Sequence, residues 1–538
     1  MRLESACGVL VRTAADRTRA PRAVADSALN MGRAAPSTDA PSAPFVERNS
    51  MGSREHPIDV DKLDEPQRDD LSPLTPLQKL PGRAQLEAER LARQATRKAS
   101  DDLPRKRART ERHTLAVLPR YVSITAQDRF WNGAFKATYN MHTPAQPGTQ
   151  LAEAILPTTR RDPAGVQRIL LASFDVDIDW LESLFPDVPI TYVGNPAHGP
   201  DAPAPGFYPR GFWEMCVPPS LHPRALQHIK LVVLYYHDRL RVIVSSGNLT
   251  PLDWMRYDNT FYVQDFARGT ASGDFWEQLK LVYASFGIKK HPAVDMLSGY
   301  DLGKAGAYLV ASWPIVHTVK GWDKMAACGL GRLHHIARKL QVGSCTLEAQ
   351  GSSLAAYDRR WLEQFWLAAC GCDPAMLPLP RTNPKAQAPW PPIRILFPTQ
   401  RWVEQESVDG IGGGGCFFGR ADEFERRGLR HLYAQPDCIR GRLFMHAKCI
   451  LAECTSRGHK SGWVYAGSAN FTRAAWGTIS GTRAEPTLSL SNWELGVMVP
   501  LDACLDCSPL DAVPYGRPVR PYGPTDTPWD VRTLIGTQ

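Results

Sequence analysis

The amino-acid sequence predicts an α/β protein made of two similar α/β/α lobes, related by a pseudo-twofold axis and preceded by a disordered tail. Each lobe is expected to be a mixed sheet flanked by helices. Strand-like runs rich in β-branched residues alternate with helix-like segments, which is the pattern of layered α/β domains. In addition, one segment with His-x-Lys, an apolar run, a turn ending in Asn and a short helix occurs twice, more than two hundred residues apart.

Length and composition agree with two domains in a globular protein. A chain of 538 residues is too long for one ordinary domain and fits two large domains plus a tail. Hydrophobic residues make up 43% of the chain, and no run of eighteen apolar residues occurs, so we expect no membrane span. The formal net charge of +8 is compatible with a polyanionic partner.

The cysteines follow no zinc-binding or disulfide pattern. Twelve are scattered along the chain, and the C-x-x-C of Cys504 and Cys507 has no second pair at zinc-finger spacing. We therefore interpret all twelve as reduced thiols of an intracellular protein. We expect neither a metal site nor a cofactor.

Residues 1–112 are expected to be a disordered, basic and proline-rich tail. They hold few aromatic residues and cannot bury enough surface to offset the entropy of the chain. The cluster "PRKRARTER" fits a nuclear localisation signal or a nucleic-acid-binding arm, with a solvated run of charges as the alternative. The Arg-rich start fits a transit peptide, a disordered tail, or a chain whose true start is Met31 or Met51.

Residues 113–304 are expected to form the first lobe. The segment "RILLASFDVDIDWLESLFP" predicts a strand, a turn and a helix. A further helix is predicted for "FWEQLKLVYASFG". Strands are predicted for "ITYVG", "KLVVLYY" and "LRVIVSS".

The pattern starts again in residues 305–538, which are expected to form the second lobe. Its first strand is predicted for "AYLVASWPIV", and later strands for "IRILFPT", "AKCILAE" and "WVYAG". Helices are predicted for "GLGRLHHIARKL" and "DRRWLEQFWLAAC". Loops are predicted for the glycine-rich "GIGGGGC" and for "CTSRGHKSG".

The two copies of the repeated segment place the same chemical groups at the same positions. Residues two apart on a strand project to one face, so each His-x-Lys presents an imidazole and an ammonium together. The residues are His228 and Lys230 in the first copy, and His446 and Lys448 in the second.

An asparagine ends the return strand of each copy. Asn248 follows Gly247, and Asn470 lies two residues after Ser468. Each asparagine comes just before a short helix, whose N-terminus favours anions. If the lobes face each other, two imidazoles, two ammonium groups and two amides converge on one place.

Such a site fits phosphodiester cleavage. Two lysines and two amides can bind a tetrahedral anion without a metal, and they counter the charge of the equatorial oxygens. One histidine can attack phosphorus while the other, protonated, donates to the leaving oxygen, which implies a phosphohistidine intermediate. A single His-x-Lys on a strand is common, but two copies in matching contexts favour catalysis.

This doubled pattern resembles the phospholipase D superfamily. Members usually carry Asp five positions after the Lys, where this chain has Tyr235 and Glu453. The missing Asp resembles the tyrosyl-DNA phosphodiesterase branch. Further stretches resemble that branch from about residue 115 to the C-terminus: "SFDVDIDWL", "SSGNLTPLDW", "GSANFTRAAWG", "NWELGVMVP" and "PYGPTDTPW".

The resemblance implies hydrolysis of the bond between a tyrosine and the 3′-phosphate of DNA, a DNA-repair reaction on adducts left by stalled topoisomerase I. It implies His228 as nucleophile and His446 as general acid and then base. Glu494 would orient His228. The phosphate would be held by Lys230, Lys448, Asn248 and Asn470.

The resemblance also implies partners and a location. The expected partners are DNA with a 3′-phosphotyrosyl or other 3′ block, single-stranded at its end, and a topoisomerase I-derived peptide. We expect a monomer in the nucleus, and a minor mitochondrial pool stays open.

The chain departs from this branch in one place. The branch typically has Gln supporting the second histidine, where this chain has Asn259, one methylene shorter. Serines that contact DNA in the branch fall near "VGSCTLEAQGSSLA". The further candidates for substrate binding are Ser344, Ser352, Ser353, Ser468 and Gly247.

Two alternatives belong to other classes. One is another enzyme of the superfamily that acts on phospholipids or as a general nuclease, which the absent Asp, the basic arm and "NWELG" disfavour. The other is an inactive DNA-binding relative, which the presence of both histidines and both lysines disfavours.

Overall fold

The computed structural model describes residues 129–536, apart from residues 156–164, 186, 197–202, 220–224, 316–318, 378–388 and 457–458. The described residues belong to one compact unit. The predicted tail of residues 1–112, with its basic cluster and alternative start sites, lies outside the described residues.

The first large sheet takes its strands from residues 134–267. They are β1 (Ala134–Ala137), β2 (Val166–Ala172), β3 (Ile190–Val193), β4 (Gly206–Arg210), β5 (Trp213–Val217), β7 (Leu231–Tyr236), β8 (Arg239–Ser245) and β9 (Thr260–Ala267). Their order is β1-β9-β8-β7-β2-β3-β5-β4. The sheet is mixed, because β2, β3 and β5 are parallel neighbours while β7 and β8 pair antiparallel.

The second large sheet takes its strands from residues 308–521. They are β10 (Tyr308–Ser312), β12 (Thr346–Gln350), β13 (Ile393–Leu396), β14 (Tyr433–Gln435), β15 (Lys448–Ser456), β16 (His459–Gly467), β19 (Asn492–Pro500) and β20 (Arg520–Pro521). Their order is β10-β19-β16-β15-β12-β13-β14-β20, and β6 (Leu226–Gln227) adds to β19. A small third sheet joins β11 (Val319–Lys320), β18 (Pro486–Ser489) and β17 (Thr478–Gly481).

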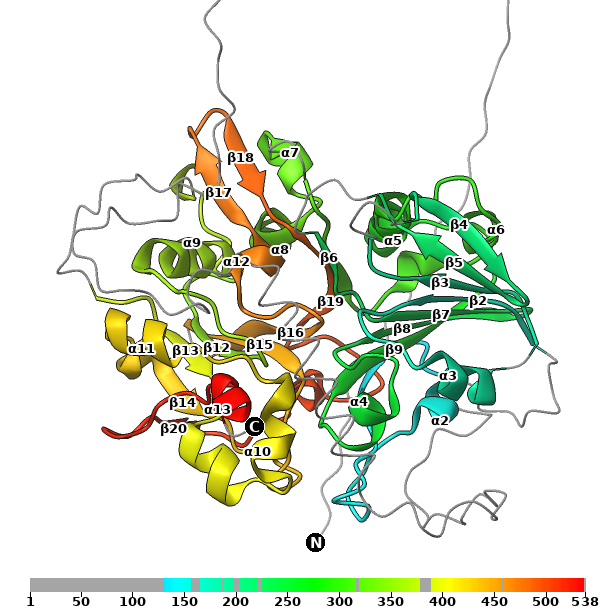
Figure 1. The fold of residues 1–538 in the computed structure, drawn as a ribbon. Helices are drawn as coiled ribbons and strands as arrows, with labels where there is room; N and C mark the ends of the chain where they lie inside the picture. Colours follow the sequence, from blue (N-terminus) through cyan, green and yellow to red (C-terminus); the bar gives the residue numbers. More distant parts are fainter. Residues whose placement is uncertain are drawn as a thin grey trace, which may run out of the picture. The chain divides into compact units, whose positions relative to one another are not determined.

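Helices flank both large sheets, as Figure 1 shows. The first lobe has α2 (Leu151–Ile155), α3 (Ile178–Leu184), α4 (Pro251–Met255), α5 (Gly273–Ser285) and α6 (Pro292–Leu297). The second has α7 (Trp322–Met325), α8 (Gly329–Lys339), α9 (Arg359–Ala369), α10 (Gly410–Gly413), α11 (Ala421–Arg427), α12 (Arg473–Trp476) and α13 (Arg532–Gly536). Within the described residues, none of these helices has both the length and the apolar character needed to cross a membrane.

The central strands are buried on both faces. In β7, Leu231 and Val233 pack in one hydrophobic cluster while Val232 and Leu234 pack in another, as the two-residue period of a strand requires. The cluster of Leu231 also contains residues of α5 and of β15, β16 and β19, so it joins the two lobes. The predicted fold class, two α/β lobes with mixed sheets, is confirmed. The lobe boundary near residue 304 stays a prediction.

Two segments predicted as loops contain regular secondary structure. Gly410–Gly413 forms α10 and Gly414–Cys416 a 3₁₀ turn, although glycine is a weak helix former. Tertiary packing overrides propensity here, since a Cβ on Gly413 would lie 2.3 Å from Phe444 and one on Gly414 would lie 2.6 Å from Trp529. In the predicted loop "CTSRGHKSG", β15 extends to Ser456 and β16 begins at His459.

The two residues at the positions where the superfamily usually has Asp each have hydrogen-bond partners of their own. The Tyr235 hydroxyl is buried, lies 2.8 Å from the Tyr283 hydroxyl and donates to the Ala293 carbonyl at 2.9 Å. Glu453 accepts a hydrogen bond from Arg517 at 3.0 Å. Both residues therefore serve the fold rather than the site.

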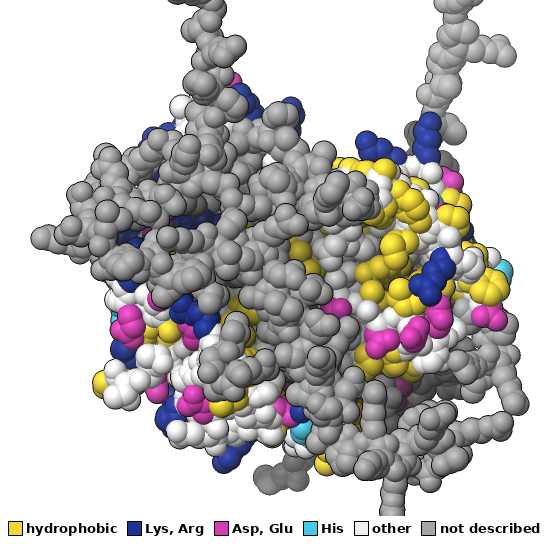
Figure 2. Space-filling view, viewed as in Figure 1, with side chains coloured by type: hydrophobic (Ala, Val, Ile, Leu, Met, Phe, Trp, Pro, Cys, Tyr) yellow, Lys and Arg dark blue, Asp and Glu magenta, His cyan; other side chains and the backbone are white. Residues whose placement is uncertain are grey.

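The far edge of the first sheet carries exposed apolar side chains. Phe207 and Tyr208 on β4, Phe212 in the turn and Met215 on β5 are all partly exposed. Figure 2 shows apolar side chains at the right of this face, where Figure 1 places β4 and β5. Three strands separate β4 from β7, so this edge is remote from the hairpin of the first His-x-Lys.

Candidate active site

Each His-x-Lys lies at the start of a buried hairpin, and the two hairpins have equivalent registers. The Ser245 amide donates to the Lys230 carbonyl at 2.9 Å, and Lys448 pairs with Gly467. The chain then turns through Ser246–Asn248 in the first copy and through Ser468–Asn470 in the second. The repeated sequence therefore builds the same local structure twice.

A threonine cap follows each turn and starts a short helix. The Thr250 hydroxyl accepts from the Asp253 amide at 3.3 Å, with Pro251 at the first helical position of α4. The Thr472 hydroxyl accepts from the Ala475 amide at 3.3 Å at the start of α12. These caps hold the asparagines Asn248 and Asn470 at matching places.

Each lysine bends back onto its own histidine. The Lys230 Nζ donates to the His228 carbonyl at 2.7 Å, and the Lys448 Nζ donates to the His446 carbonyl at 2.5 Å. Both ammonium groups are buried, which is costly unless opposite charge lies nearby. The pair of lysines therefore favours an anion between the two copies.

The first histidine is held by a carboxylate of the second lobe. The Nδ1 of His228 lies 2.9 Å from Glu494 Oε2, and the His228 amide donates to the Trp493 carbonyl at 2.9 Å. The Ser468 hydroxyl donates to the same Glu494 oxygen at 2.5 Å. A partner on Nδ1 fixes the tautomer and leaves the chemistry to Nε2.

Burial raises the pKa of Glu494 to about 7. The charges of Lys230 and Lys448 and the hydrogen bonds from Ser468 and Asn492 act in the opposite direction but do not cancel the desolvation. This carboxyl group therefore changes charge near neutral pH beside His228.

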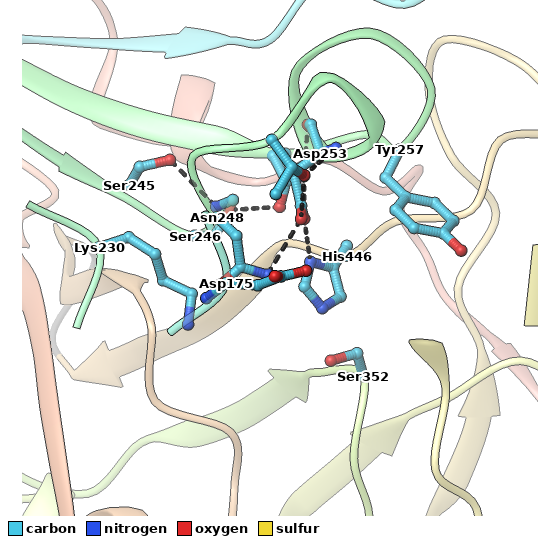
Figure 3. Close-up of polar contacts among 12 residues, drawn as sticks. Asp175, Lys230, Ser245, Ser246, Asn248, Asp253, Tyr257, Ser352 and His446 are labelled. Atoms are coloured by element: carbon cyan, nitrogen blue, oxygen red, sulfur yellow. Dashed lines mark hydrogen bonds and ion pairs between the residues drawn. The ribbon is translucent and has the colours of Figure 1, made fainter. Parts of the chain in front are cut away.

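The second histidine is held by a carboxylate of the first lobe. The Nδ1 of His446 lies 2.7 Å from Asp253 Oδ1, and the other Asp253 oxygen accepts from Asn248 at 3.0 Å and Thr250 at 3.2 Å. In the view of Figure 3, the imidazole lies between Asp253 and Ser352. The ring of Tyr257 lies 5.7 Å from it.

The pKa of Asp253 lies below its usual value. Burial alone would raise this pKa. The effect of burial is more than offset by the charge and hydrogen bond of His446, the hydrogen bond from Asn248 and the charge of Lys448. Asp253 is therefore a permanent anion beside His446, unlike Glu494 beside His228.

The two asparagines are anchored through their amide oxygens. The Asn248 oxygen accepts from the Asp175 amide at 3.4 Å, in the loop after β2. The Asn470 oxygen accepts from the Ser352 and Ser353 amides at 2.9 and 3.2 Å, in the loop after β12. One N–H of the Asn248 amide donates to Asp253, which leaves its second N–H for an anion. Anchoring the Asn470 oxygen directs its NH₂ group to the opposite side, where it can donate to an anion.

The structure brings the predicted groups together. Lys448 acts electrostatically on both Asp253 and Glu494, and Lys230 acts on Glu494, so the two carboxylate–histidine pairs share one electrostatic environment. Each pair joins the two lobes. Imidazole, ammonium and amide groups from both copies of the repeat therefore belong to this shared environment.

Three predicted residues have contacts within the site other than those expected. Asn259 contacts the residue that lies beside His446: its Nδ2 donates to the Asp253 carbonyl at 2.8 Å and lies 3.4 Å from Asp253 Oδ1. Ser468 is buried against Glu494. The Gly247 amide donates to Ser245, and a Cβ there would lie 3.0 Å from Asn259.

Ser344 does not reach the site. It precedes β12, whose other end leads to Ser352, and it lines a surface pocket of about 600 Å³ with Arg338 and Trp366. Eight residues of nearly extended chain span about 25 Å, so the two serines lie at opposite ends of the strand. Of the serine candidates, Ser352 and Ser353 are the ones held beside Asn470.

Sequence reasoning missed Asp253 and Asp175. A signal for Asp253 was present, because the matched helices read "TPLDW" and "TRAAW", and a carboxylate in only one copy of a repeat is informative. Asp175, in "SFDVDIDWL", reaches the site through its backbone amide, which donates to Asn248 at 3.4 Å, and such a contact leaves no signal in the residue type.

Comparison with known proteins gives consistent results. A tyrosyl-DNA phosphodiesterase 1 of Drosophila melanogaster is 24% identical over 347 residues, and one of Arabidopsis thaliana is 23% identical over 440 residues. The matches cover 58% and 67% of this chain, and 58% and 68% of those relatives. The chain thus spans little more than half of the Drosophila protein.

A solved structure shares the fold. The crystal structure of the yeast tyrosyl-DNA phosphodiesterase superposes with a TM-score of 0.55 at 19% identity and covers 74% of this chain and 99% of that one. The family model described as tyrosyl-DNA phosphodiesterase matches residues 153–524, well over half of the chain. On this match, the chain belongs to the tyrosyl-DNA phosphodiesterase family.

Proposed function

We propose that the protein hydrolyses the bond between a tyrosine and the 3′-phosphate of DNA, through a covalent phosphohistidine and without a metal. Family membership supports the substrate class. The single observation that carries the chemistry is the pair of buried histidines, each with a carboxylate on Nδ1 and each followed by a buried lysine.

In the first step, His228 Nε2 attacks phosphorus while the bond to the tyrosine oxygen breaks. His446, protonated, gives its Nε2 proton to that oxygen, so tyrosine leaves as a neutral phenol. The positive charge that develops on the His228 ring is countered by Glu494. Because a phenol has a pKa of about 10, it leaves more readily than a sugar hydroxyl, and the acid supplies only part of the help.

In the second step, His446 is neutral and takes a proton from water. The hydroxide that develops attacks phosphorus, the P–N bond breaks, and His228 returns as neutral imidazole with its proton on Nδ1. The products are DNA with a 3′-phosphate and a protonated His446. The enzyme has then regained its starting state.

The lysines and asparagines hold the phosphate through both steps. Lys230 and Lys448 supply charge, and the amide groups of Asn248 and Asn470 supply oriented donors. Donors fixed before the reaction typically contribute the largest share of such catalysis. Ser352 and Ser353 present their backbone to Asn470 and lie beside the path of the DNA in this proposal.

The same proposal sets the partners. The DNA is single-stranded at its 3′ end, the leaving group is a topoisomerase I-derived peptide, and other 3′ blocks are accepted when they fit. The protein acts in DNA repair, as a nuclear monomer.

The test is cleavage of an oligonucleotide with a 3′-phosphotyrosine in excess EDTA. We expect full activity, with a 3′-phosphate as product. Activity that appears only after a divalent metal is added would refute the mechanism. Parallel assays on phosphatidylcholine and on unmodified duplex DNA separate this function from that of a phospholipase or general nuclease.

A further inference from the structure

The two halves of the site differ in the residue that occupies equivalent positions beside the two histidines. In the second lobe, the Ser468 hydroxyl donates to Glu494 at 2.5 Å and accepts from the Leu495 amide at 2.9 Å. In the first lobe, the Ser246 hydroxyl donates to Asn259 at 2.9 Å and accepts from the Thr260 amide at 3.0 Å. Asn259 therefore occupies the place that Glu494 occupies in the other half.

Asn259 does not perform the task of its counterpart. Its Nδ2 donates to the Asp253 carbonyl at 2.8 Å and lies 3.4 Å from Asp253 Oδ1. Asp253 in turn lies 2.7 Å from the Nδ1 of His446. The repeat itself would place Ala475 at the position of Asp253, so this carboxylate exists in one half alone.

We propose that Asp253 is the positioning residue of His446, replacing a shortened side chain at position 259 and supplying a full negative charge to the second histidine. The proposal rests on the proposed function and adds a residue to it. Asp253 fixes the tautomer that presents Nε2 and stabilises the imidazolium, so His446 is a better proton carrier in both steps.

The surroundings of His446 support this role. Lys448 on β15 directs its ammonium to the His446 carbonyl rather than to the ring. Tyr257, which follows α4, is neutral because its pKa lies well above the usual value. Burial is the main cause, followed by the neighbouring Cys416, and Asp253 and Asp409 contribute less. Asp253 is an anion in contact with the ring, and it is held by Asn248, Thr250 and Asn259.

The consequence is a division of charge between the two histidines. Asp253 stays ionised and favours protonated His446, as an acid requires. Glu494, with a pKa of about 7, exerts less pull on His228, which must be neutral to attack. When the environments of two carboxyl groups shift their pKa values in opposite directions, the shifts typically indicate which side of the site acts as the acid and which as the nucleophile.

The experiment compares Asp253→Asn with the unsubstituted protein and with Asp238→Asn, the same change on the exposed turn between β7 and β8. Two substrates are used: a 3′-phosphotyrosyl oligonucleotide and a 3′-(4-nitrophenyl)phosphate oligonucleotide, whose leaving group needs no proton. Rates of the first step and of adduct hydrolysis are followed separately between pH 5 and 9.

For Asp253→Asn, we expect the alkaline limb of kcat/KM with the tyrosyl substrate to move down by about 1 pH unit or more, since an adjacent opposite charge shifts a pKa by about 1–3 units. The nitrophenyl substrate should still form the adduct within about threefold of the normal rate, whereas adduct hydrolysis should slow by about 10- to 100-fold. Asp238→Asn should match the unsubstituted protein.

Other results would overturn the inference. An unchanged pH profile, or equal losses on both substrates, would give Asp253 a purely structural role. A larger pH shift in Asn259→Ala than in Asp253→Asn would make Asn259 the true partner of His446. If the unsubstituted protein cleaves neither substrate, the proposed function fails and the inference falls with it, which is a distinct outcome from a failure in the variant alone.

Discussion

At the scale of single residues, the two histidines look alike in sequence but differ in their partners. His228 contacts a carboxyl group that titrates near neutral pH, and His446 contacts a permanent anion. The roles of nucleophile and acid should therefore not be interchangeable.

Alanine substitutions test this asymmetry. We expect His228→Ala to lose at least about 10³-fold in rate, because the nucleophile is gone. His446→Ala should still attack the tyrosyl bond slowly but fail to activate water, so a covalent protein–DNA species should accumulate. Denaturing gels with labelled oligonucleotide measure it, and an adduct on the His228 variant instead would reverse the two roles.

Glu494 links the site to stability. Its folded-state pKa of about 7 lies above the unfolded value, so the stability it contributes is complete below about pH 4 and is lost as the pH rises through about 7. Relative to Glu494→Gln, the unsubstituted protein should lose free energy of unfolding on the order of 3 kcal/mol between these limits.

Urea unfolding of both proteins at several pH values measures this difference. Glu277→Gln, a change on the exposed face of α5, is the control and should run parallel to the unsubstituted protein at every pH. If the unsubstituted protein instead gained unfolding free energy relative to Glu494→Gln as the pH rises, Glu494 would be stabilised as an anion in the folded state.

At the scale of elements, the regular strands and longer helices were predictable because their patterns are local. β7 and β15 follow from apolar runs, and α8 and α9 follow from helical periodicity. The α10 helix was not predictable, since glycine is a weak helix former and of its glycines only Gly413 packs closely, against Phe444.

The site residues, too, were predictable where a sequence pattern marks them, and not where they depend on how the lobes pack. Both His-x-Lys pairs, both asparagines and Glu494 follow from the repeat and the resemblance. Asp253 was missed because its contact with His446 spans 193 positions and depends on how the lobes meet. Ser344 was misplaced because a strand, which sequence alone did not locate there, separates it from Ser352.

Tyr235 tests whether the position of the missing Asp has any part in catalysis. Tyr235→Phe removes a buried hydroxyl that bonds the Ala293 carbonyl, and should cost about 1–2 kcal/mol of unfolding free energy. Cleavage of the tyrosyl substrate should be unchanged within about twofold, because β7 keeps its shape.

Chemical unfolding and steady-state kinetics of Tyr235→Phe check both expectations. Tyr208→Phe, the same change on the exposed edge strand β4, should leave stability within about 0.5 kcal/mol. A selective loss of activity in Tyr235→Phe would return this position to the active site.

At the scale of the whole molecule, the lobes are joined beside the site. β6 pairs with β19 next to His228, and Asp258 pairs with Met445 next to His446. Arg256, just after α4, donates to Asp409 through two bonds of 2.6 and 3.1 Å. These contacts keep Asp253 in register with His446 and Glu494 in register with His228.

A double-mutant cycle on Arg256 and Asp409 tests this coupling. Each single alanine change should cost about 1–3 kcal/mol of stability, because it removes a two-bond ion pair in which the Asp409 carboxylate is buried. His142 stays beside Asp409 in the Arg256 variant. The double change should cost less than the sum of the two, by about 0.5–3 kcal/mol.

Cleavage assays on the same variants measure the effect on the site. Adduct hydrolysis, which depends on His446 in the proposed mechanism, should suffer more than adduct formation, because Arg256 ends the short helix α4 that carries Asp253. Strictly additive losses of stability would show that the pair does not connect the lobes.

Because each histidine depends on the opposite lobe, the order of synthesis matters. Glu494 follows His228 by 266 positions in the chain. A ribosome that has released only the first hairpin displays His228 without Glu494 and without the second imidazole. His228 therefore gains the carboxylate on its Nδ1 only after the later half of the chain has emerged and docked.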